Sequence, residues 1–160
     1  MAYEFYVSIE GTKTGKFKGE SLRTPHKDKL PGFFYQSGID SPRDVASGQA
    51  SGKRQHIPVV FRKKVGAATP QLANALVTNE VLKTVLFEFV QTTKDGKEEI
   101  VFTIKLLDST ISSHRIVLPD VTGGSTVNQD LFEEVQLTFG KIEWEHKVAK
   151  TMAIDDWYKG

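Results

Sequence analysis

The stretch VLKTVLFEFVQTTKDGKEEIVFTIKLL, residues 81–107, decides the fold class. It contains two runs rich in β-branched and aromatic residues, 81–91 and 98–107, joined by Lys94-Asp95-Gly96-Lys97. Such runs are typical of strands. The Asp-Gly pair accepts positive φ at both central positions, which is the geometry of a tight hairpin turn. The stretch therefore predicts a β-hairpin.

Upstream, two segments show the alternation of a half-buried strand. Residues 3–9 place every second side chain, all apolar, on one face. Residues 57–65 do the same, with Lys63 interrupting the apolar face. Pro58 has no N–H to donate, so we expect it near the strand start or at a sheet edge. Both segments predict strands of the same β-rich domain.

One short helix is expected between these strands and the hairpin. Thr69 offers a hydroxyl to cap free N–H groups, and Pro70 suits the first helical position. Asn79 accepts the left-handed conformation that ends a helix. The apolar positions at helical spacing are Leu72, Ala73, Leu76 and Val77. This spacing predicts a helix packed on a sheet.

The segment before residue 57 is unusual. An aromatic run at 33–35 predicts a strand over residues 29–37, but residues 38–56 contain several glycines, a proline and few large apolar side chains. A connection of this length without secondary structure is uncommon, and most such loops are functional or disordered. We therefore expect the function of the chain to involve residues 38–56.

The C-terminal third continues the β pattern. Residues 111–118 read as a further strand closed by Pro119. The apolar phase of residues 135–139 shifts by one residue at Ile142 and Trp144. A β-bulge at Gly140-Lys141 restores both sets to the core and bends the strand, which suits a barrel or a tightly packed double sheet. The pattern predicts about seven strands and one helix.

Composition limits the function classes. The chain has 160 residues, which suits one domain spanning 1–160, and 21 basic against 20 acidic residues, which makes nucleic acid a poor partner. Cysteine is absent, which removes disulfides and thiol chemistry. The start has no signal-peptide pattern and no stretch is apolar enough to span a membrane. We expect synthesis in the cytoplasm, with any export through a dedicated machine.

Motifs for catalysis or cofactor binding are weak. Residues 11–16 superficially resemble a phosphate-binding loop but have the wrong glycine spacing, and Phe17 stands where Ser or Thr is required. A polar turn is the better interpretation. The four histidines do not have the spacing of a metal site. They are His26, His56, His114 and His146.

Three polar groupings are interpreted as surface. Residues 112–114, Ser-Ser-His, lie in a predicted strand where neighbours point to opposite faces. Glu133-Glu134 and Asp155-Asp156 diverge in the same way, which favours solvated carboxylates over a catalytic pair. A basic cluster has no interleaved aromatic residues, so it favours a protein contact over nucleic acid. Its members are Lys53, Arg54, Arg62, Lys63 and Lys64.

The order of these parts resembles the haemolysin-coregulated protein family, Hcp, the tube subunit of bacterial type VI secretion. The resemblance covers most of the chain. Its most specific stretches are GKRQHIPVVF at 52–61, TPQL at 69–72 and FGKIEWE at 139–145, and the opening MAYEFYVSIEG also looks like the family's start.

The resemblance implies a mostly β fold, a compact β-barrel of two packed sheets with one short α-helix and a long extended loop. It implies a hexameric ring that stacks into a hollow tube, expelled by a contractile sheath with a spike protein and effectors and so secreted. It implies no catalytic residue. From composition and motif spacing we expect no cofactor, metal, nucleic-acid partner or membrane insertion. The loop at 38–56 would contribute to contacts between stacked rings. Its candidate residues are Gly38, Asp40, Arg43, Asp44, Gln49, Lys53, Arg54 and His56.

Three alternatives stay open from the sequence. A monomeric barrel that binds an apolar ligand needs a roomy interior, whereas large side chains here are expected to fill it. The expected core aromatic residues are Phe5, Phe61, Phe87, Phe89, Phe102, Phe139 and Trp144. A tail-tube protein of a contractile phage would have a related fold. A toxin-carrying member of the family usually adds a C-terminal domain, which we do not expect in a chain that stops at Gly160.

Overall fold

A computed structural model describes residues 3–22, 26–120, 122 and 130–157. These residues form nine strands and one helix, all antiparallel where strands pair. The elements are β1 (Tyr3–Gly11), β2 (Gly15–Lys16), β3 (Leu30–Asp40), β4 (Gln55–Lys64), α1 (Thr69–Val77), β5 (Leu82–Thr92), β6 (Glu98–Val117), β7 (Phe132–Thr138), β8 (Lys141–His146) and β9 (Thr151–Asp156).

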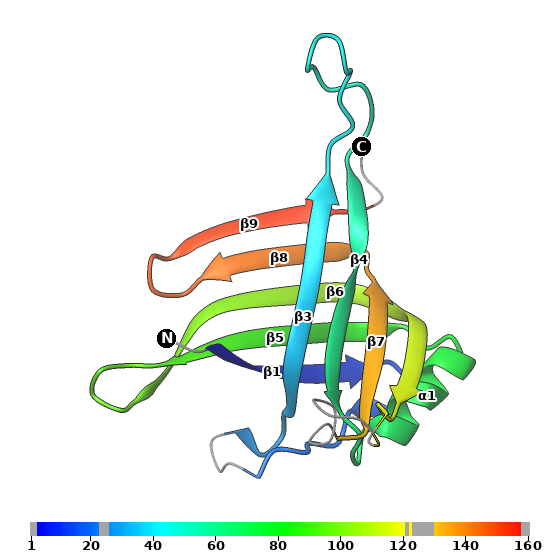
Figure 1. Ribbon diagram of the computed structural model, residues 1–160, viewed down its shortest axis with the longest axis vertical. Coiled ribbons are helices and arrows are strands. Elements are labelled where there is room, and N and C mark those ends of the chain that lie inside the picture. Colours follow the sequence, from blue (N-terminus) through cyan, green and yellow to red (C-terminus); the bar gives the residue numbers. More distant parts are fainter. Residues whose placement is uncertain (1–2, 23–25, 121, 123–129, 158–160) are drawn as a thin grey trace.

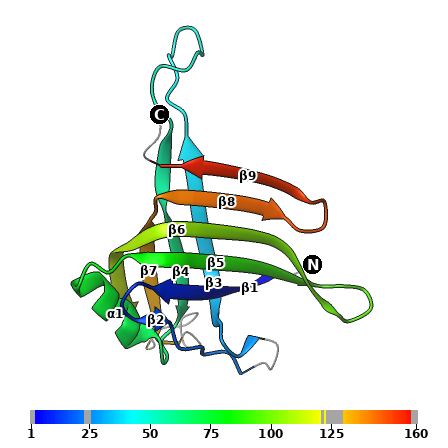
Figure 2. The ribbon, with the colours of Figure 1, turned by 180° about the vertical axis from the view of Figure 1, so that it is seen from behind.

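The strands close into a barrel. The pairing runs from β1 through β3, β4, β7, β6 and β5 and returns to β1. Strands β8 and β9 extend the sheet beyond β6, and β2 pairs with the end of β1. In Figure 1 the layer of β3, β4 and β7 crosses in front of β1, β5, β6, β8 and β9, and Figure 2 shows the second layer from behind. The predicted barrel of two packed sheets is confirmed.

Side chains fill the interior of this barrel. Phe61, Phe87, Leu106 and Leu137 have no measurable exposure. Of the expected core aromatic residues, four are buried and the other three pack against the core while partly exposed. The buried ones are Phe5, Phe61, Phe87 and Phe139, and the partly exposed ones are Phe89, Phe102 and Trp144. They occupy the space that a ligand-binding barrel would need.

The helix is present, but two details of its prediction are wrong. Ala68 is the N-cap residue, and Thr69 instead accepts a hydrogen bond from the Gly66 N–H at 2.9 Å and donates to Glu133. Val77, which was predicted to face the sheet, is 82% exposed, because the buried face of the helix is formed by Leu72 and Ala75 instead. Asn79 does follow the helix with φ of 54°, as predicted. Among the described residues no helix is long and apolar enough to cross a membrane.

The hairpin of β5 and β6 is confirmed, with a different turn. Only Gly96 has a positive φ, 79°, and its N–H donates to the Thr93 carbonyl at 3.0 Å. The Thr93 N–H donates to the Lys97 carbonyl at 2.7 Å. The connection is therefore a three-residue turn that ends on a left-handed glycine.

Strand β6 is longer than the sequence predicts. The expected separate strand at 111–118 is the second half of β6, which runs without interruption past Asp108, a residue with φ of 52°. The predicted bulge at Gly140-Lys141 is instead a break between two strands. Strand β8 pairs with the first half of β6 and β7 with the second. The Gly140 N–H donates to the Leu107 carbonyl at 2.9 Å, so the break between β7 and β8 lies beside the irregular Asp108 of β6.

Candidate assembly surface

The connection between β3 and β4 is an ordered hairpin. Strand β3 continues to Asp40 and β4 begins at Gln55, so the connection is shorter than the predicted 38–56 and covers residues 41–54, here named the extended loop. Arg43 and Ala50 form a β-bridge across it. Figure 1 shows the extended loop projecting well beyond the barrel.

The tip of the extended loop holds itself together through its backbone. The Asp44 N–H donates to the Gln49 carbonyl, and the Gly48 N–H to the Asp44 carbonyl, both at 2.8 Å. Gly48 supplies the positive φ that the turn requires, 73°. Hydrogen bonds from the Ala46 N–H and the Ser47 hydroxyl to the Asp44 carboxylate lower the pKa of that carboxyl. The tip is a defined shape before it meets any partner.

At the base of the extended loop, three residues form an ionic group that we name the Asp155 cluster. Arg54 donates two hydrogen bonds to the carboxylate of Asp155, from Nε at 2.6 Å and from an Nη at 2.7 Å. The same Nη also donates to the Asp156 carbonyl at 2.6 Å. His56 Nε2 lies 2.6 Å from the same carboxylate. The hydrogen bonds from Arg54, and then that of His56, lower the pKa of Asp155 to about 2.

Aromatic side chains support the Asp155 cluster. The ring of His56 lies 5.2 Å from that of Phe139 and 5.4 Å from that of Trp157. The His56 side chain is only 2% exposed, whereas that of Asp155 is 25% exposed. The cluster therefore fastens the start of β4 to the edge strand β9, and it fixes the direction in which the extended loop leaves the barrel.

The structure separates the eight residues predicted for ring stacking into three groups. Gly38 and Asp40 belong to β3 and pair with Ile57 and Gln55 of β4. Arg54 and His56 face inward, onto Asp155 of their own chain. The remaining four lie on the projecting part of the extended loop and are exposed. They are Arg43, Asp44, Gln49 and Lys53.

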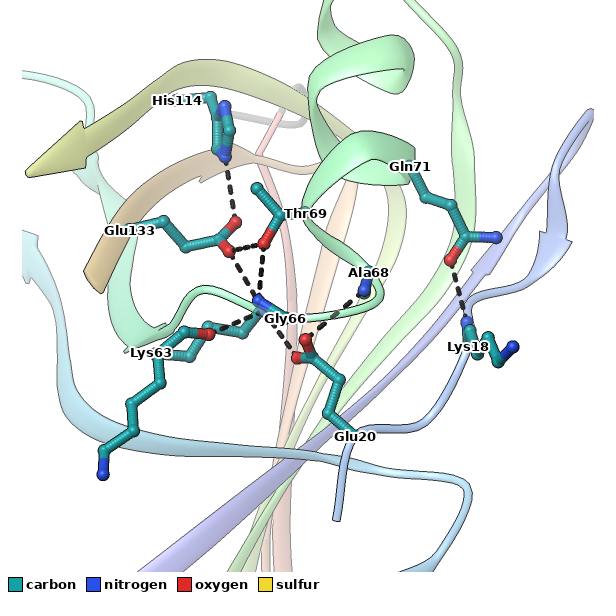
Figure 3. A network of polar contacts seen from close by, with 10 residues as sticks. Lys18, Glu20, Lys63, Gly66, Ala68, Thr69, Gln71, His114 and Glu133 are labelled. Atoms are coloured by element: carbon teal, nitrogen blue, oxygen red, sulfur yellow. Dashed lines mark hydrogen bonds and ion pairs between the residues drawn. The ribbon is translucent and has the colours of Figure 1, made fainter. Parts of the chain in front are cut away.

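At the other end of β4 lies a second ionic group, which we name the Glu133 cluster (Figure 3). The Glu133 carboxylate accepts hydrogen bonds from the Thr69 hydroxyl and from Lys63 Nζ at 3.1 Å, and lies 2.9 Å from His114 Nε2. Lys63 and Glu133 have no measurable side-chain exposure. Lys63 Nζ also donates to Glu20 at 2.5 Å. Charges this deep persist only when each is paired.

The Glu133 cluster joins elements that are far apart in the sequence. Glu20 lies in the connection after β2, and its carboxylate also accepts from the Ala68 N–H at the start of α1, at 3.3 Å. In the same region Gln71 of α1 accepts from the Lys18 N–H at 2.9 Å. As Figure 3 shows, these contacts converge under the first turn of the helix. They hold the helix and the connection before β3 to the barrel.

Several interpretations of polar residues as surface are wrong. Glu133 is fully buried, the His114 side chain is 6% exposed against it, and Asp155 is bound by Arg54 and His56. Members of the basic cluster also disperse: Lys63 is buried, while Arg62 Nε pairs with Glu134 at 2.8 Å on the outer face. Most of the charged residues in these groupings are paired within the chain.

The residues interpreted as a polar turn, 11–16, do form one. They connect β1 to β2, and their Lys13 and Thr14 N–H groups donate to the Glu80 carboxylate at 3.1 and 2.9 Å. Although burial raises the pKa of Glu80, the hydrogen bonds from Thr14 and Lys13 lower it overall. Within the described ranges, no group of three or more His, Cys, Asp or Glu residues is placed to hold a metal ion.

The alternation of inward and outward positions along the strands already indicated that members of the Glu133 cluster are buried. Glu133 continues backward the alternating face of Val135 and Leu137, so the period of two places it inside. Lys63 stands in the same way after Val59 and Phe61. Two opposite charges in phase with buried faces of different strands predict a buried ion pair. The sequence does not show that β4 and β7 are neighbours, however.

Most of the chain matches a known protein family. The model of the family described as "Type VI secretion system effector, Hcp" matches residues 6–146. The chain belongs to the Hcp family. This match covers every strand of the closed barrel except the first three residues of β1, and it ends before β9. It agrees with the family that the sequence motifs resembled.

Individual Hcp relatives support the same assignment. A protein of Pseudomonas aeruginosa PAO1 named major exported protein is 31% identical, over 98% of this chain and 96% of its own length. A crystal structure of an Hcp protein has a TM-score of 0.92 and 30% identity, covering 99% of this chain and 100% of that one. The secreted protein Hcp3 of Pseudomonas aeruginosa has a TM-score of 0.77 and 26% identity, covering 96% and 99%.

Hcp membership settles the broad class of function. It indicates a tube-subunit role in type VI secretion, self-assembly into rings, and secretion of the chain. The family is structural rather than enzymatic.

Proposed function

We propose that this chain, as one domain over residues 1–160, forms a homohexameric ring that stacks into the hollow tube of a type VI secretion system. The tube is expelled by contraction of a sheath, with a spike protein at its tip, and effector proteins travel in its lumen. The subunit is made in the cytoplasm without a signal peptide. The observation that carries this proposal is the Hcp family match over a filled barrel with a long projecting hairpin.

Ring closure needs two different patches on each subunit that fit head to tail. Strand β9 offers one, because among the described residues it pairs with β8 alone and forms an edge of the sheet. Met152 and Ile154 are each 59% exposed along it. An edge with exposed apolar side chains is a template for association unless a partner covers it. A neighbouring subunit in the ring supplies such a cover.

Electron microscopy of the purified chain, together with light scattering, tests the ring. Microscopy is expected to show rings, and tubes at high concentration. Light scattering is expected to give a particle mass six times the subunit mass of 17.9 kDa. Replacing Ile154 by Lys is expected to dissociate the rings, since it places a charge in the contact. The matched variant Val148→Lys changes an exposed residue of the β8–β9 turn and is expected to leave them intact. If the protein at high concentration contained no species larger than a monomer, the ring proposal would be refuted.

The role of the extended loop in stacking has its own test. The Arg43–Ala50 bridge allows residues 44–49 to be replaced by Asn-Gly without disturbing the stem. Rings are expected to persist while tubes and secretion into the medium are lost. The same replacement of residues 94–96 in the β5–β6 turn is the control. Normal tubes and secretion from the shortened loop would rule out its stacking role.

A further inference from the structure

A pocket rich in aromatic side chains lies between the two layers of the barrel, near the base of the extended loop. We name it the aromatic pocket. In Figure 1, β3 and β4 cross in front of β8 in this region, and residues of all three strands line the pocket. Its volume is about 350 Å³, within the range of roughly 300–1,000 Å³ that is typical of small-molecule sites. The main lining residues are Ser37, Ile39, His56, Phe139, Ile142 and Trp144.

The aromatic pocket has a buried wall and an exposed apolar rim. Phe139 and Ile142 form part of the wall, and each is only 2% exposed. Ile39 and Ile57 also line the pocket, yet they are 44% and 41% exposed. A Cβ atom at Gly38 would lie 3.1 Å from Ile57 Cδ1, so glycine at this position leaves Ile57 its place. A molecule that enters past the two isoleucines therefore covers apolar surface that is otherwise in contact with water.

Two of the rings that line the aromatic pocket are nearly parallel. The ring centroids of His56 and Trp144 are 6.5 Å apart, and the ring planes are inclined by 20°. Carbon atoms in contact lie about 3.5 Å apart, so a flat ring between two parallel rings needs roughly 7 Å. Trp144 is partly exposed at the margin of the core, so it can shift by the small remaining amount. This placement suits a planar ligand that stacks on one or both rings.

The polar groups of the aromatic pocket favour a ligand that donates a hydrogen bond. His56 Nε2 lies 2.6 Å from the Asp155 carboxylate, which accepts, so in the neutral imidazole this nitrogen carries the proton and Nδ1 is an acceptor. Ser37 adds a hydroxyl, which can donate or accept. The Asp155 carboxylate already pairs with Arg54. A charged ligand would therefore lose its hydration without gaining an ion pair from this carboxylate.

From these observations we propose that the aromatic pocket binds a neutral, planar heteroaromatic molecule of one or two fused rings that carries an N–H or O–H donor. The ligand stacks on Trp144 and His56, and its donor bonds to His56 Nδ1 or to the Ser37 hydroxyl. This binding activity goes beyond the proposed tube function. All the lining residues belong to one chain, so binding needs no second copy, and failure of the proposal would leave the tube function standing.

Titration of the purified full chain with benzimidazole tests the proposal. This probe is planar, neutral near neutral pH, and carries one N–H donor. The chain has two tryptophans: Trp144 lines the pocket, and the ring of Trp157 lies 5.4 Å from that of His56. Binding is therefore expected to change tryptophan fluorescence in a saturable way, with a dissociation constant on the order of 1 mM or below. N-methylbenzimidazole lacks the donor and cyclohexanol is not planar, so both are expected to bind at least about fivefold more weakly.

Variants at Trp144 test the stacking. Trp144→Leu keeps an apolar side chain but removes the ring, and it is expected to weaken benzimidazole binding at least about fivefold. Trp144→Phe keeps an aromatic ring and is expected to retain most of the affinity. Trp157 remains in both variants as the fluorescent reporter.

A variant at the rim tests the pocket without changing the core. Ile39→Glu places a charge beside the entrance and is expected to weaken binding at least about fivefold, also where Trp144→Leu fails to fold. Ile116→Glu, on a residue of β6 that is 55% exposed, is the matched control and is expected to bind as the native chain does. The proposal would be overturned by the absence of a saturable fluorescence change, by equal binding of benzimidazole and cyclohexanol, or by unchanged affinity in Ile39→Glu.

Discussion

The two ionic clusters at the ends of strand β4 have similar chemistry and different surroundings. The Glu133 cluster holds Lys63 and Glu133 wholly out of water, whereas Asp155 in the other cluster keeps a quarter of its side chain exposed. Buried ions lose their hydration, so a broken pair there leaves a large penalty uncompensated. Ions in partial contact with water lose less. The first cluster therefore fixes the fold, and the second fixes the direction of the extended loop.

The largest effect is expected from Glu133→Ala. Within the described part of the chain, this change leaves Lys63 with Glu20 as its one carboxylate partner, and it removes the acceptor of Thr69 and His114. We expect a loss of about 3–5 kcal/mol in the free energy of unfolding, measured by urea denaturation. The neighbouring Glu134→Ala removes a pair with Arg62 on the outer face and should cost under about 1 kcal/mol. If the two variants lost equal amounts of unfolding free energy, burial would not explain the difference between the two carboxylates.

A smaller effect is expected from Asp155→Asn. The change removes a charged acceptor shared by Arg54 and His56, and such hydrogen bonds contribute about 1.5–3 kcal/mol. Cleavage of the extended loop by a protease should become faster, because its base is no longer fastened to β9. The control is Glu143→Gln on β8, which removes one carboxylate charge outside the Asp155 cluster. An unchanged cleavage rate for Asp155→Asn would show that the cluster does not position the loop.

The Asp155 cluster should also respond to acid. The pKa of Asp155 is about 2 in the folded chain, against an ordinary value of 3.8. A lowered pKa stabilises the fold fully above the ordinary value, and this stabilisation is lost as the pH falls toward the folded value. The difference in unfolding free energy between the native chain and Asp155→Asn should therefore shrink between about pH 4 and pH 2. A difference that stays constant over this interval would contradict the assignment.

The smallest effect is expected from Lys64→Ala. Lys64 follows the buried Lys63 in the sequence, but its side chain is 72% exposed and pairs with the equally accessible Asp130. The unfolding free energy should change by less than about 0.5 kcal/mol. Thermal unfolding of Lys63→Ala measured alongside should show the much larger loss. A loss above about 2 kcal/mol for Lys64→Ala would mean that burial does not separate these adjacent lysines.

Local features of the fold were predictable because their causes lie within a few residues. The alternation of residues 3–9, the Asp95-Gly96 turn region and the left-handed Asn79 all belong to short segments. Strand β9 was missed because four of its six residues are exposed, so it shows no alternation between buried and exposed faces. The continuity of β6 was missed because residues 98–107 and 111–118 were interpreted as two strands, whereas the strand continues through Asp108 with a φ of 52°.

The ionic clusters were not predicted because their partners are distant in sequence. Arg54 meets Asp155, and Lys63 meets Glu133, only once β4 has taken its place in the barrel and β9 has extended the sheet. A carboxylate beside another polar residue looks solvated until the strand opposite it is known. The loop at 38–56 was recognised by its length, but its inward-facing Arg54 and His56 were not distinguishable from its exposed residues.

The closed path of strands has a consequence for the order of events when the chain folds. Strand β1 pairs with β5, and β4 pairs with β7, so several of the pairings that close the barrel join distant parts of the chain. Such non-local pairings slow folding, because the chain loses conformational entropy in bringing remote segments together before their contacts stabilise it. Since β7 supplies the partner for β4 and half of β6, a nascent chain has an incomplete barrel until residues 132–138 are available.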